Sequence, residues 1–444
     1  MATNKDILDA QRFNKRRLIS AFNSGAPGGR ELEPKSMMGP LIAGTIITIV
    51  ILVGAWITGR FAPALPADWG NGYYVIDKDT GARYFSINDT LHPVRNTTSA
   101  RLLSPDANLK QVTVGASALK SIERGPEIGI VGAPDSIPDK TALHNLGWVA
   151  CPIDDAVNLT IGVRPDIPTA PHGALVETGS ATFFITEGHR HEIASEDVNK
   201  VKVALGWESV PIVPVPDMWI NLFEQGAPLA PLTVPEAGKP VETLAGALAQ
   251  AHVGTLITVK DPDRDDPRVY VVNPDETLTL LTGFDRRMYE INSEHNPDDE
   301  ILASIADIAS VSVTDTRIGD ETWPQTVPEA VMDNNIPCSA LVTIDDHTQT
   351  LVLASTGPTA PGIHVEGGTG ALVGSSSGGS LVAVNLITDA GKSYGIAGQR
   401  EQTLAHLGYT LDDVIHVPAT WVKLVPEGPV LSIDDAWASV PQDQ

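Results

Sequence analysis

Residues 205–226, LGWESVPIVPVPDMWINLFEQG, decide the fold, because the chain repeats their pattern at residues 407–428 as LGYTLDDVIHVPATWVKLVPEG. The two stretches share a Leu-Gly pair, a Val-Pro pair, a tryptophan, a leucine and a final glycine, at a constant spacing of 202 residues. Internal repetition indicates an array of small, similar structural units. Trp219 and Trp421 occupy one repeat position, so we expect both rings to pack in the core rather than to stack on a ligand.

A turn that contains glycine precedes both stretches and also occurs near residue 80. Residues 389–394 read DAGKSY, residues 187–191 read EGHRH, and residues 79–84, DTGARY, share D-x-G-x-x-Y with the first of them. Glycine supplies the positive φ that a tight turn between strands requires, so the pattern predicts a hairpin. The predicted turn glycines are Gly81, Gly188 and Gly391, and the predicted equivalents on the returning strand are Tyr84, His191 and Tyr394.

A fourth, fainter copy of the repeat begins near residue 270. Residues 270–281, YVVNPDETLTLL, resemble strands, and Ile301–Ser310 is the expected helix of this copy. The segments 131–181 and 317–380 lie between copies and contain one cysteine each, which suggests a central unit. The expected fold is α+β, with these limits: leader 1–36, transmembrane helix 37–59, repeat 1 60–130, central domain 131–181 and 317–380, repeat 2 182–240, repeat 3 241–316, and repeat 4 381–444.

Leu41–Thr58, LIAGTIITIVILVGAWIT, is an uncharged run of 18 residues. A helix rises 1.5 Å per residue, so this run can cross a hydrocarbon core of about 30 Å. Basic residues outnumber acidic ones before the run, and the remainder of the chain is acidic. The positive-inside rule therefore predicts a single-pass anchor with a cytoplasmic N-terminus and an extracytoplasmic domain after Arg60. A buried core helix is the alternative interpretation.

Residues 6–22, DILDAQRFNKRRLISAF, combine apolar and basic side chains in a pattern compatible with one amphipathic helix. Such a helix could lie on anionic lipid or against a partner protein. The alternative is a solvated basic leader that only sets the membrane topology.

Cys151 and Cys338 are the two cysteines of the chain. An extracytoplasmic compartment permits a disulfide, and two thiols make one possible pair. A bridge across so long a loop would stabilise the fold by roughly 5 kcal/mol in the chain-entropy model. Two separate buried thiols remain the alternative, and a metal site is disfavoured because neither cysteine has neighbours at ligand spacing.

The balance of charge excludes one class of partner. The chain has 30 basic and 55 acidic residues and a formal charge of −25. Binding of nucleic acid requires clustered Lys and Arg to neutralise phosphates, so no nucleic-acid partner is expected.

Gly391-Lys392-Ser393 matches the end of a phosphate-binding loop, but the first glycine of that motif would fall on Leu386. The repeat comparison explains Gly391 as a hairpin glycine instead. These three residues are therefore only a weak candidate for nucleotide binding, and we expect no cofactor.

Gly374–Gly378 satisfies G-x-S-x-G with Ser376 as the nucleophile of a serine hydrolase. The match lies inside the glycine- and serine-rich stretch 357–380, where such matches arise by composition, and the apolar run after it resembles a strand. We expect a flexible loop here and no catalytic residue.

Two groups of polar side chains have features of metal sites. Asp261, Asp263 and Asp265 have the opening spacing of a calcium loop, but the glycine and the final glutamate of that loop are missing. His189, His191 and Glu192 could bind a metal, yet His191 occupies a repeat position that tyrosine fills elsewhere. We expect a solvated acidic turn, a structural histidine and no metal.

The ordered set of motifs resembles the EccB family of type VII (ESX) secretion systems over essentially the whole chain. The resemblance rests on QRFNKRRLISAF before the apolar run, GYYVIDKDTGARYFSINDTLHPVRNTTSARLL after it, then GIVGAPDSIP, LGWVACP and VPATWVKLVPEGPVLS. It implies an elongated domain of four repeats around a disulfide-closed central domain, with quasi-twofold symmetry. It also implies partnership with EccC-, EccD- and EccE-like subunits in an inner-membrane core that exports WXG100-type proteins.

The EccB family has been described as ATPases, but this sequence contains no complete phosphate-binding loop. We therefore expect a scaffold that self-associates through its extracytoplasmic domain. The alternatives are an extracytoplasmic enzyme, either an ATPase or a cell-envelope hydrolase, and a cell-wall anchor.

Overall fold

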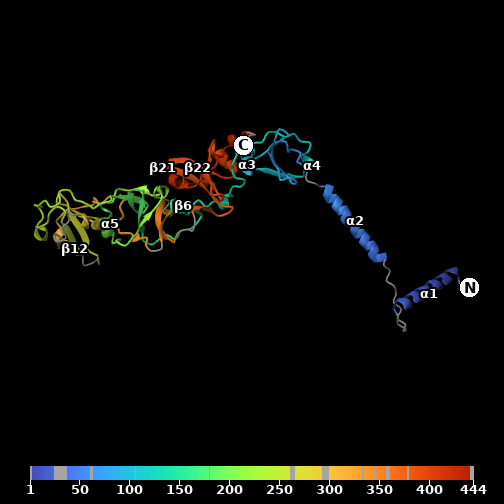
Figure 1. Ribbon diagram of the computed structural model, residues 1–444, viewed down its shortest axis with the longest axis horizontal. Helices are drawn as coiled ribbons and strands as arrows, with labels where there is room; N and C mark the ends of the chain where they lie inside the picture. The colour runs from blue at the N-terminus through green and yellow to red at the C-terminus, as the bar shows by residue number, and fades with distance from the viewer. Residues whose placement is uncertain are drawn as a thin grey trace. The chain divides into compact units, whose positions relative to one another are not determined.

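The computed structural model describes residues 3–24, 38–60, 64–105, 107–179, 181–260, 266–292, 300–332, 335–344, 347–356, 361–377 and 380–440. The chain divides into two compact units, Met1–Leu65 and Pro66–Gln444. Among these described residues, the first unit contains two helices and the second contains the sheets (Figure 1).

The first unit consists of α1 (Asn4–Ser24) and α2 (Met38–Arg60). The predicted span Leu41–Thr58 falls within α2, although the side chains of residues 55–60 lie outside the described set. In the described part of the chain, no helix combines the length and the apolar character that crossing a membrane requires.

Within the described residues, the second unit contains five sheets, which confirms the expected mixture of α and β structure. Four of the sheets share one topology. Three antiparallel strands are followed by a helix, by a strand that pairs parallel with the first strand, and by a helix of four residues. The chain then returns to pair parallel with the third strand. These four sets are called repeats 1 to 4 below.

Repeats 1 and 2 come first along the chain. Repeat 1 comprises β1 (Tyr73–Asp77), β2 (Arg83–Ile87), β3 (Thr90–Pro93), α3 (Thr97–Leu103), β4 (Lys110–Val114) and α4 (Ala116–Leu119). Repeat 2 comprises β7 (His172–Thr178), β8 (Ala181–Thr186), β9 (His189–Ile193), α5 (Val198–Leu205), β10 (Ile212–Pro214), α6 (Asp217–Ile220) and β11 (Glu224–Gln225), and β17 (Glu329–Ala330) also pairs with β7.

Repeats 3 and 4 have the same order of elements. Repeat 3 comprises β12 (Leu256–Lys260), β13 (Arg268–Val272), β14 (Leu278–Leu280), α7 (Gly283–Glu290), β15 (Ile301–Ser304), α8 (Ile305–Ile308) and β16 (Val313–Thr314). Repeat 4 comprises β21 (Gly370–Ser377), β22 (Ser380–Thr388), β23 (Ser393–Ile396), α9 (Arg400–Leu407), β24 (Ile415–Pro418) and α10 (Ala419–Val422), and α11 (Ile433–Trp437) follows.

The strand order changes one predicted equivalence. Gly188 and Gly391 precede the third strand of their repeats, whereas Gly81 lies in the turn between the first and second strands of repeat 1. Tyr84 is therefore not the counterpart expected from the sequence. A glycine turn suits any hairpin, so it does not identify which hairpin it closes. The three residues that share the position are His92, His191 and Tyr394.

The expectation of a helix at Ile301–Ser310 was wrong in part. Residues 301–304 form β15, which pairs parallel with β12, and only residues 305–308 are helical. The longer helix of repeat 3 is α7, whose start is capped by the side chain of Thr282. Packing of β15 beside β12 outweighs the helical pattern of its sequence.

The fifth sheet is the central sheet, with strand order β19-β18-β5-β6-β20. Its strands come from two distant segments, which are β5 (Trp148–Ile153) and β6 (Ala156–Ile161), and then β18 (Ile336–Ile344), β19 (His347–Ser355) and β20 (Gly362–Val365). Cys151 and Cys338 form a disulfide across β5 and β18, with a Cα–Cα distance of 4.3 Å and a sequence separation of 187. The predicted disulfide is confirmed.

The glycine- and serine-rich stretch 357–380 was expected to be a flexible loop, and this expectation was wrong for most of it. Residues 362–365 form β20 of the central sheet and residues 370–377 form β21, the first strand of repeat 4. Residues 357–360, 378 and 379 lie outside the described residues. β21 forms despite its small residues because it pairs with β22 on one edge and with β24 on the other.

Three hydrophobic cores join the sheets. Repeats 1 and 4 share one core, where α3 packs against α9 and α11. Repeats 2 and 3 share a second core, where α5 packs against α7. The third core joins the central sheet to repeats 2 and 4, which are therefore the inner repeats.

Candidate functional sites

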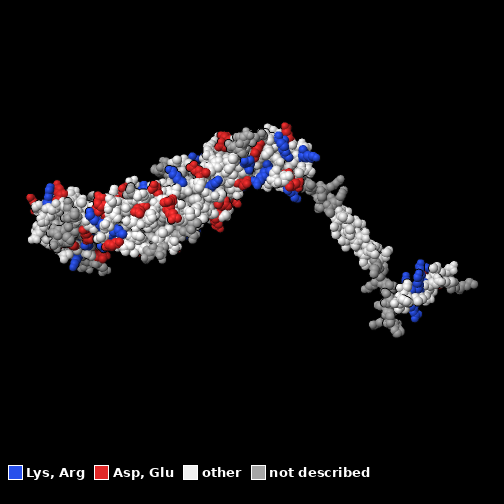
Figure 2. Space-filling view, viewed as in Figure 1, with Lys and Arg blue, Asp and Glu red and all other residues white. Residues whose placement is uncertain are grey.

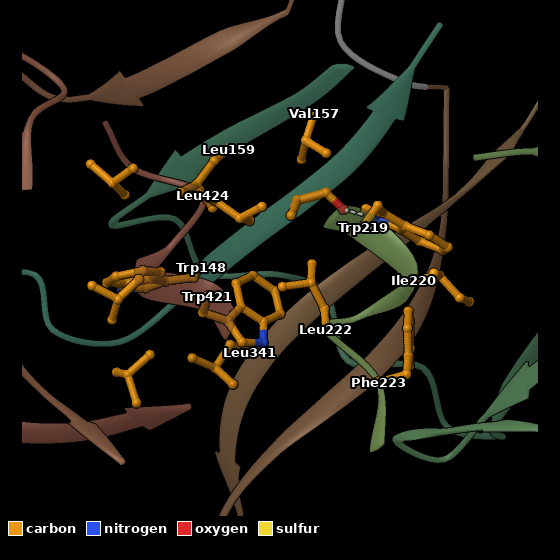
Figure 3. Packing of buried hydrophobic residues seen from close by; sticks show 14 of the residues in the cluster. Trp148, Val157, Leu159, Trp219, Ile220, Leu222, Phe223, Leu341, Trp421 and Leu424 are labelled. Atoms are coloured by element: carbon orange, nitrogen blue, oxygen red, sulfur yellow. Dashed lines mark hydrogen bonds between the residues drawn. The ribbon is translucent and has the colours of Figure 1, made fainter. Parts of the chain in front are cut away.

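The two repeat tryptophans lie at the contacts between the inner repeats and the central sheet. Both side chains are fully buried. The Trp219 Nε1 donates to the backbone oxygen of Ala150 on β5 at 2.9 Å, and Figure 3 shows this bond as a dashed line. The Trp421 Nε1 donates to the Thr350 hydroxyl on β19 at 3.3 Å. A buried indole holds two elements together through its large apolar surface, and its N–H hydrogen bond fixes their relative orientation.

The tryptophan position distinguishes inner repeats from outer ones. It is the third residue of the four-residue helix, which is tryptophan in α6 and α10, Ala118 in α4 and Asp307 in α8. Trp148 of the central sheet packs edge-on against Trp421 with ring centroids 6.4 Å apart (Figure 3). The arrangement buries aromatic area between parts of the chain rather than opening a ligand site.

A glycine faces the ring of each of the three equivalent residues. A Cβ placed on Gly125, Gly226 or Gly428 would overlap the rings of His92, His191 or Tyr394, respectively. In repeat 3 the ring position is Thr279, and its neighbour on the returning segment is Thr314. Repeat 3 therefore has neither the ring nor the glycine, as expected if the glycine is needed to make room for the ring.

His191 packs in the interior of repeat 2. Its side chain is fully buried, and Nδ1 lies 2.8 Å from the backbone oxygen of Ala227, to which it donates. Burial lowers the pKa of His191 below its ordinary value, with a smaller contribution from nearby His189. In the described residues, no group of three or more His, Cys, Asp or Glu side chains could hold a metal ion. The calcium-loop candidates Asp261, Asp263 and Asp265 lie outside that part of the chain.

The nucleotide candidate Gly391-Lys392-Ser393 lies in the turn from β22 to β23. Gly391 has a φ of 67°, Lys392 is exposed, and the Ser393 hydroxyl accepts from the Asn385 side chain at 3.1 Å. A phosphate-binding loop needs a helix N-terminus directly after the lysine, because the first backbone N–H groups of that helix bind the phosphates. Here a strand follows.

The hydrolase candidate Ser376 lies within β21 and pairs with Leu381 of β22. Its side chain is outside the described residues. A nucleophile elbow places its serine in a sharp turn between a strand and a helix. Ser376 instead occupies a strand that continues into a hairpin.

A cavity of about 580 Å³ lies over the disulfide on the central sheet. The disulfide lines it together with Thr160 of β6 and the segment 163–168. His172 also lines it, and the Nδ1 of His172 is buried without a hydrogen-bond partner. The size suits a small molecule.

Comparison with solved structures gives the class of protein. The chain superposes on a structure titled an intact ESX-5 inner membrane complex with a TM-score of 0.66 and 22% identity, covering 100% of this chain and 97% of that one. It superposes on an EccB3 dimer from the ESX-3 core complex with a TM-score of 0.66 and 21% identity, covering 82% of this chain and 100% of that one. The chain thus has the fold of these subunits.

Comparison of sequences identifies the family. The chain belongs to the family described as Type VII secretion system ESX-1, transport TM domain B, which it matches over residues 1–442. It is 25% identical to the ESX-3 secretion system ATPase EccB3 of Mycobacterium tuberculosis H37Rv, over 89% of this chain and 82% of that protein. It is 27% identical to EccB5 of the same strain, over 91% and 87%. The chain is therefore a structural component of a type VII secretion system.

Proposed function

We propose that this chain is a scaffold of the secretion core, anchored by one membrane helix, that acts by binding rather than by turnover. The observation that carries the proposal is the pair of inner-repeat tryptophans. Each ties its repeat to the central sheet, and the disulfide joins the two halves of that sheet. A domain held together at these contacts can hold its partner subunits in fixed positions without a catalytic centre.

The proposed topology places the N-terminus in the cytoplasm and residues after Arg60 outside. Support comes from the uncharged run Leu41–Thr58, from the helix α2 that contains it, and from the exposed apolar side chains of that helix, such as Ile46 and Val50. Lys and Arg before the run set this orientation. An extracytoplasmic domain also suits the disulfide.

The proposed partners are EccC-, EccD- and EccE-like membrane subunits and a second copy of this chain. One related structure is titled as an intact ESX-5 inner membrane complex, and another as an EccB3 dimer. The proposed arrangement is an elongated, quasi-twofold domain in which repeats 1 and 4 pack together, repeats 2 and 3 pack together, and the central sheet lies between the pairs. We propose the same domain limits as those predicted from the sequence.

A second candidate function is ATP hydrolysis, because the curated relatives carry ATPase in their names. Its best site would be Lys392, which lies in a hairpin turn followed by a strand. The scaffold is favoured because the described contacts explain Gly391 and Ser393 by packing and hydrogen bonding alone.

Copurification tests the proposal. The chain is tagged at its C-terminus, native membranes are extracted in mild detergent, and the recovered proteins are identified by mass spectrometry. The scaffold predicts a large complex that contains a motor subunit and a multispanning subunit. A single uncomplexed species, under conditions that keep other membrane complexes intact, would contradict it.

A further inference from the structure

The central sheet presents different surfaces on its two faces, because side chains alternate between the faces along each strand. Trp148 of β5 and Leu159 of β6 point into the hydrophobic core that Figure 3 shows. Val149 and Thr160 pair across the same two strands and lie on the opposite face, where both are half-buried. This second face carries the cavity of about 580 Å³.

The cavity is lined by the sheet and by one connecting segment. Its floor is the second face of the sheet, including the disulfide between Cys151 and Cys338 and the side chain of Leu353 on β19. One wall is the segment 163–168, VRPDIP, which lies between β6 and β7 and contains two prolines. Proline fixes the backbone φ, so little freedom is lost in this wall when a ligand binds. A mostly apolar and rigid lining suits a ligand with an apolar body.

His172 brings an unsatisfied polar atom to the cavity. This residue begins β7 and lines the cavity, and its Nδ1 is buried without a hydrogen-bond partner among the residues that the structure describes. Its Nε2 lies 3.6 Å from the Oε2 of Glu329 on β17. A carboxylate accepts hydrogen bonds and cannot donate them, which favours a neutral ring with its hydrogen on Nε2 and with Nδ1 as an acceptor. A ligand with an N–H or O–H donor would satisfy this atom.

The charges around the cavity select an uncharged ligand. Residues 61–130 have seven basic and seven acidic side chains, whereas residues 131–444, which form the cavity, have 15 basic and 44 acidic ones. Figure 2 shows acidic side chains spread over the sheet-containing unit. This surplus of negative charge disfavours an anion. The exposed Arg164 on the cavity wall disfavours a cation, and Asp166 two residues later offsets its charge.

We propose that the cavity over the disulfide binds a small, uncharged and largely apolar molecule that donates one hydrogen bond to the Nδ1 of His172. Such a ligand contacts the central sheet and the first strand of repeat 2 at the same time. It therefore joins these two parts on the face of the sheet opposite to the core that contains Trp219. The site goes beyond the scaffold role and does not depend on the membrane anchor.

Fluoroindole tests the inference, because it is uncharged and mostly apolar and has one N–H donor. The full chain is titrated in detergent micelles, and fluorine NMR distinguishes bound ligand from ligand in the micelles, with empty micelles as the blank. We expect one saturable site per chain. The N-methyl derivative of the same compound has no N–H and should bind at least tenfold more weakly. Equal binding of the two compounds, or no saturable site, overturns the inference.

Two variants locate the site. His172→Phe keeps a ring but removes the acceptor, so it should weaken the binding of fluoroindole about tenfold and leave that of the N-methyl derivative unchanged. Thr160→Trp fills the cavity and should abolish the binding of both compounds. Thr182→Trp on β8 makes the same change at a half-buried strand residue outside the cavity lining, and it should bind fluoroindole like the wild type.

Fluoroindole binding that survives Thr160→Trp, or that is as tight in His172→Phe as in the wild type, overturns the inference. Thermal unfolding without ligand shows whether each variant is folded. The comparison of fluoroindole with its N-methyl derivative on the wild type needs no substitution, so it decides the question even where a variant fails to fold.

Discussion

At the residue scale, the fold depends on a ring packed against a glycine, used three times. The rings of His92, His191 and Tyr394 each occupy space that a Cβ on the facing glycine would fill. The sequence shows both glycine and ring at these positions, but it does not show that they touch. That contact arises from the parallel return of the chain beside the third strand of each repeat.

Gly428→Ala should destabilise the protein by about 1–3 kcal/mol, because the added Cβ forces the buried ring of Tyr394 to move. Gly395→Ala is a suitable control, since its Cβ would lie 3.9 Å from the nearest side chain. Urea unfolding followed by tryptophan fluorescence gives both values. The double change Tyr394→Thr with Gly428→Thr, which copies repeat 3, should cost less than the two single changes together, and strict additivity would refute the pairing.

His191 should make stability depend on pH. Burial lowers its pKa in the folded state, so the unfolded chain binds the proton more tightly. The stabilisation is complete above the ordinary pKa of about 6.5 and is lost as the pH falls from there through the lowered folded-state value.

His191→Phe keeps the ring but removes the titration and the hydrogen bond to Ala227. At pH 7.5 it should lower the free energy of unfolding by about 1 kcal/mol, because the bond is lost. At pH 5 this difference should shrink or reverse. Thermal unfolding at both pH values measures it, with exposed His416→Gln as the control that keeps the wild-type slope. An unchanged pH dependence in His191→Phe would rule out this role.

At the element scale, the parts of the repeat that share residues at a constant spacing could be predicted. The strands that depend on their neighbours in the folded sheet could not. The constant spacing from Leu205 to Leu407 predicts that the two positions are structurally equivalent, and in the structure both lie at the end of a helix before a left-handed glycine. The strand β15 could not be predicted, because its apolar pattern also suits a helix. The strand β21 could not be predicted either, since glycine and serine have low strand propensity and only its neighbours stabilise it.

The candidate sites also include features that could be predicted from the sequence and features that could not. The disulfide between Cys151 and Cys338 was predictable, because two cysteines allow one pair. The partners of Trp219 and Trp421 were not, since Ala150 and Thr350 are distant in sequence and contact them only after folding.

The disulfide links the two segments of the central sheet, so its loss should weaken the whole unit. Replacement of Cys151 and Cys338 by alanine should cost roughly 2–5 kcal/mol, because the bridge closes a loop of nearly two hundred residues in the unfolded chain. The midpoint of guanidinium unfolding measures the cost. The wild type in excess dithiothreitol is the control and should shift by a similar amount. A variant with an unchanged midpoint would show that hydrogen bonds between β5 and β18 suffice.

At the scale of the whole molecule, the sheet-containing unit has a central sheet, two repeats that pack on that sheet and two further repeats that pack on the first two. The two inner units carry the tryptophans, the outer units pack on them, and the acidic charge spares repeat 1, the first unit along the chain. These features account for a structural role that needs no catalysed reaction. They also separate the two readings of the family, because an ATPase would depend on Lys392 and a scaffold would depend on the contacts of Trp219 and Trp421.

The most direct test is complementation in cells that lack the chain, with the assembled secretion core measured on native gels. The scaffold account predicts that, in cells lacking the chain, the other subunits no longer migrate as one complex. Lys392→Ala should restore the complex as fully as the wild type. The double change Trp219→Ala with Trp421→Ala should not restore it, although the variant chain still inserts in the membrane. A complex that assembles without the chain, together with secretion that Lys392→Ala fails to restore, would contradict the account and favour an enzyme.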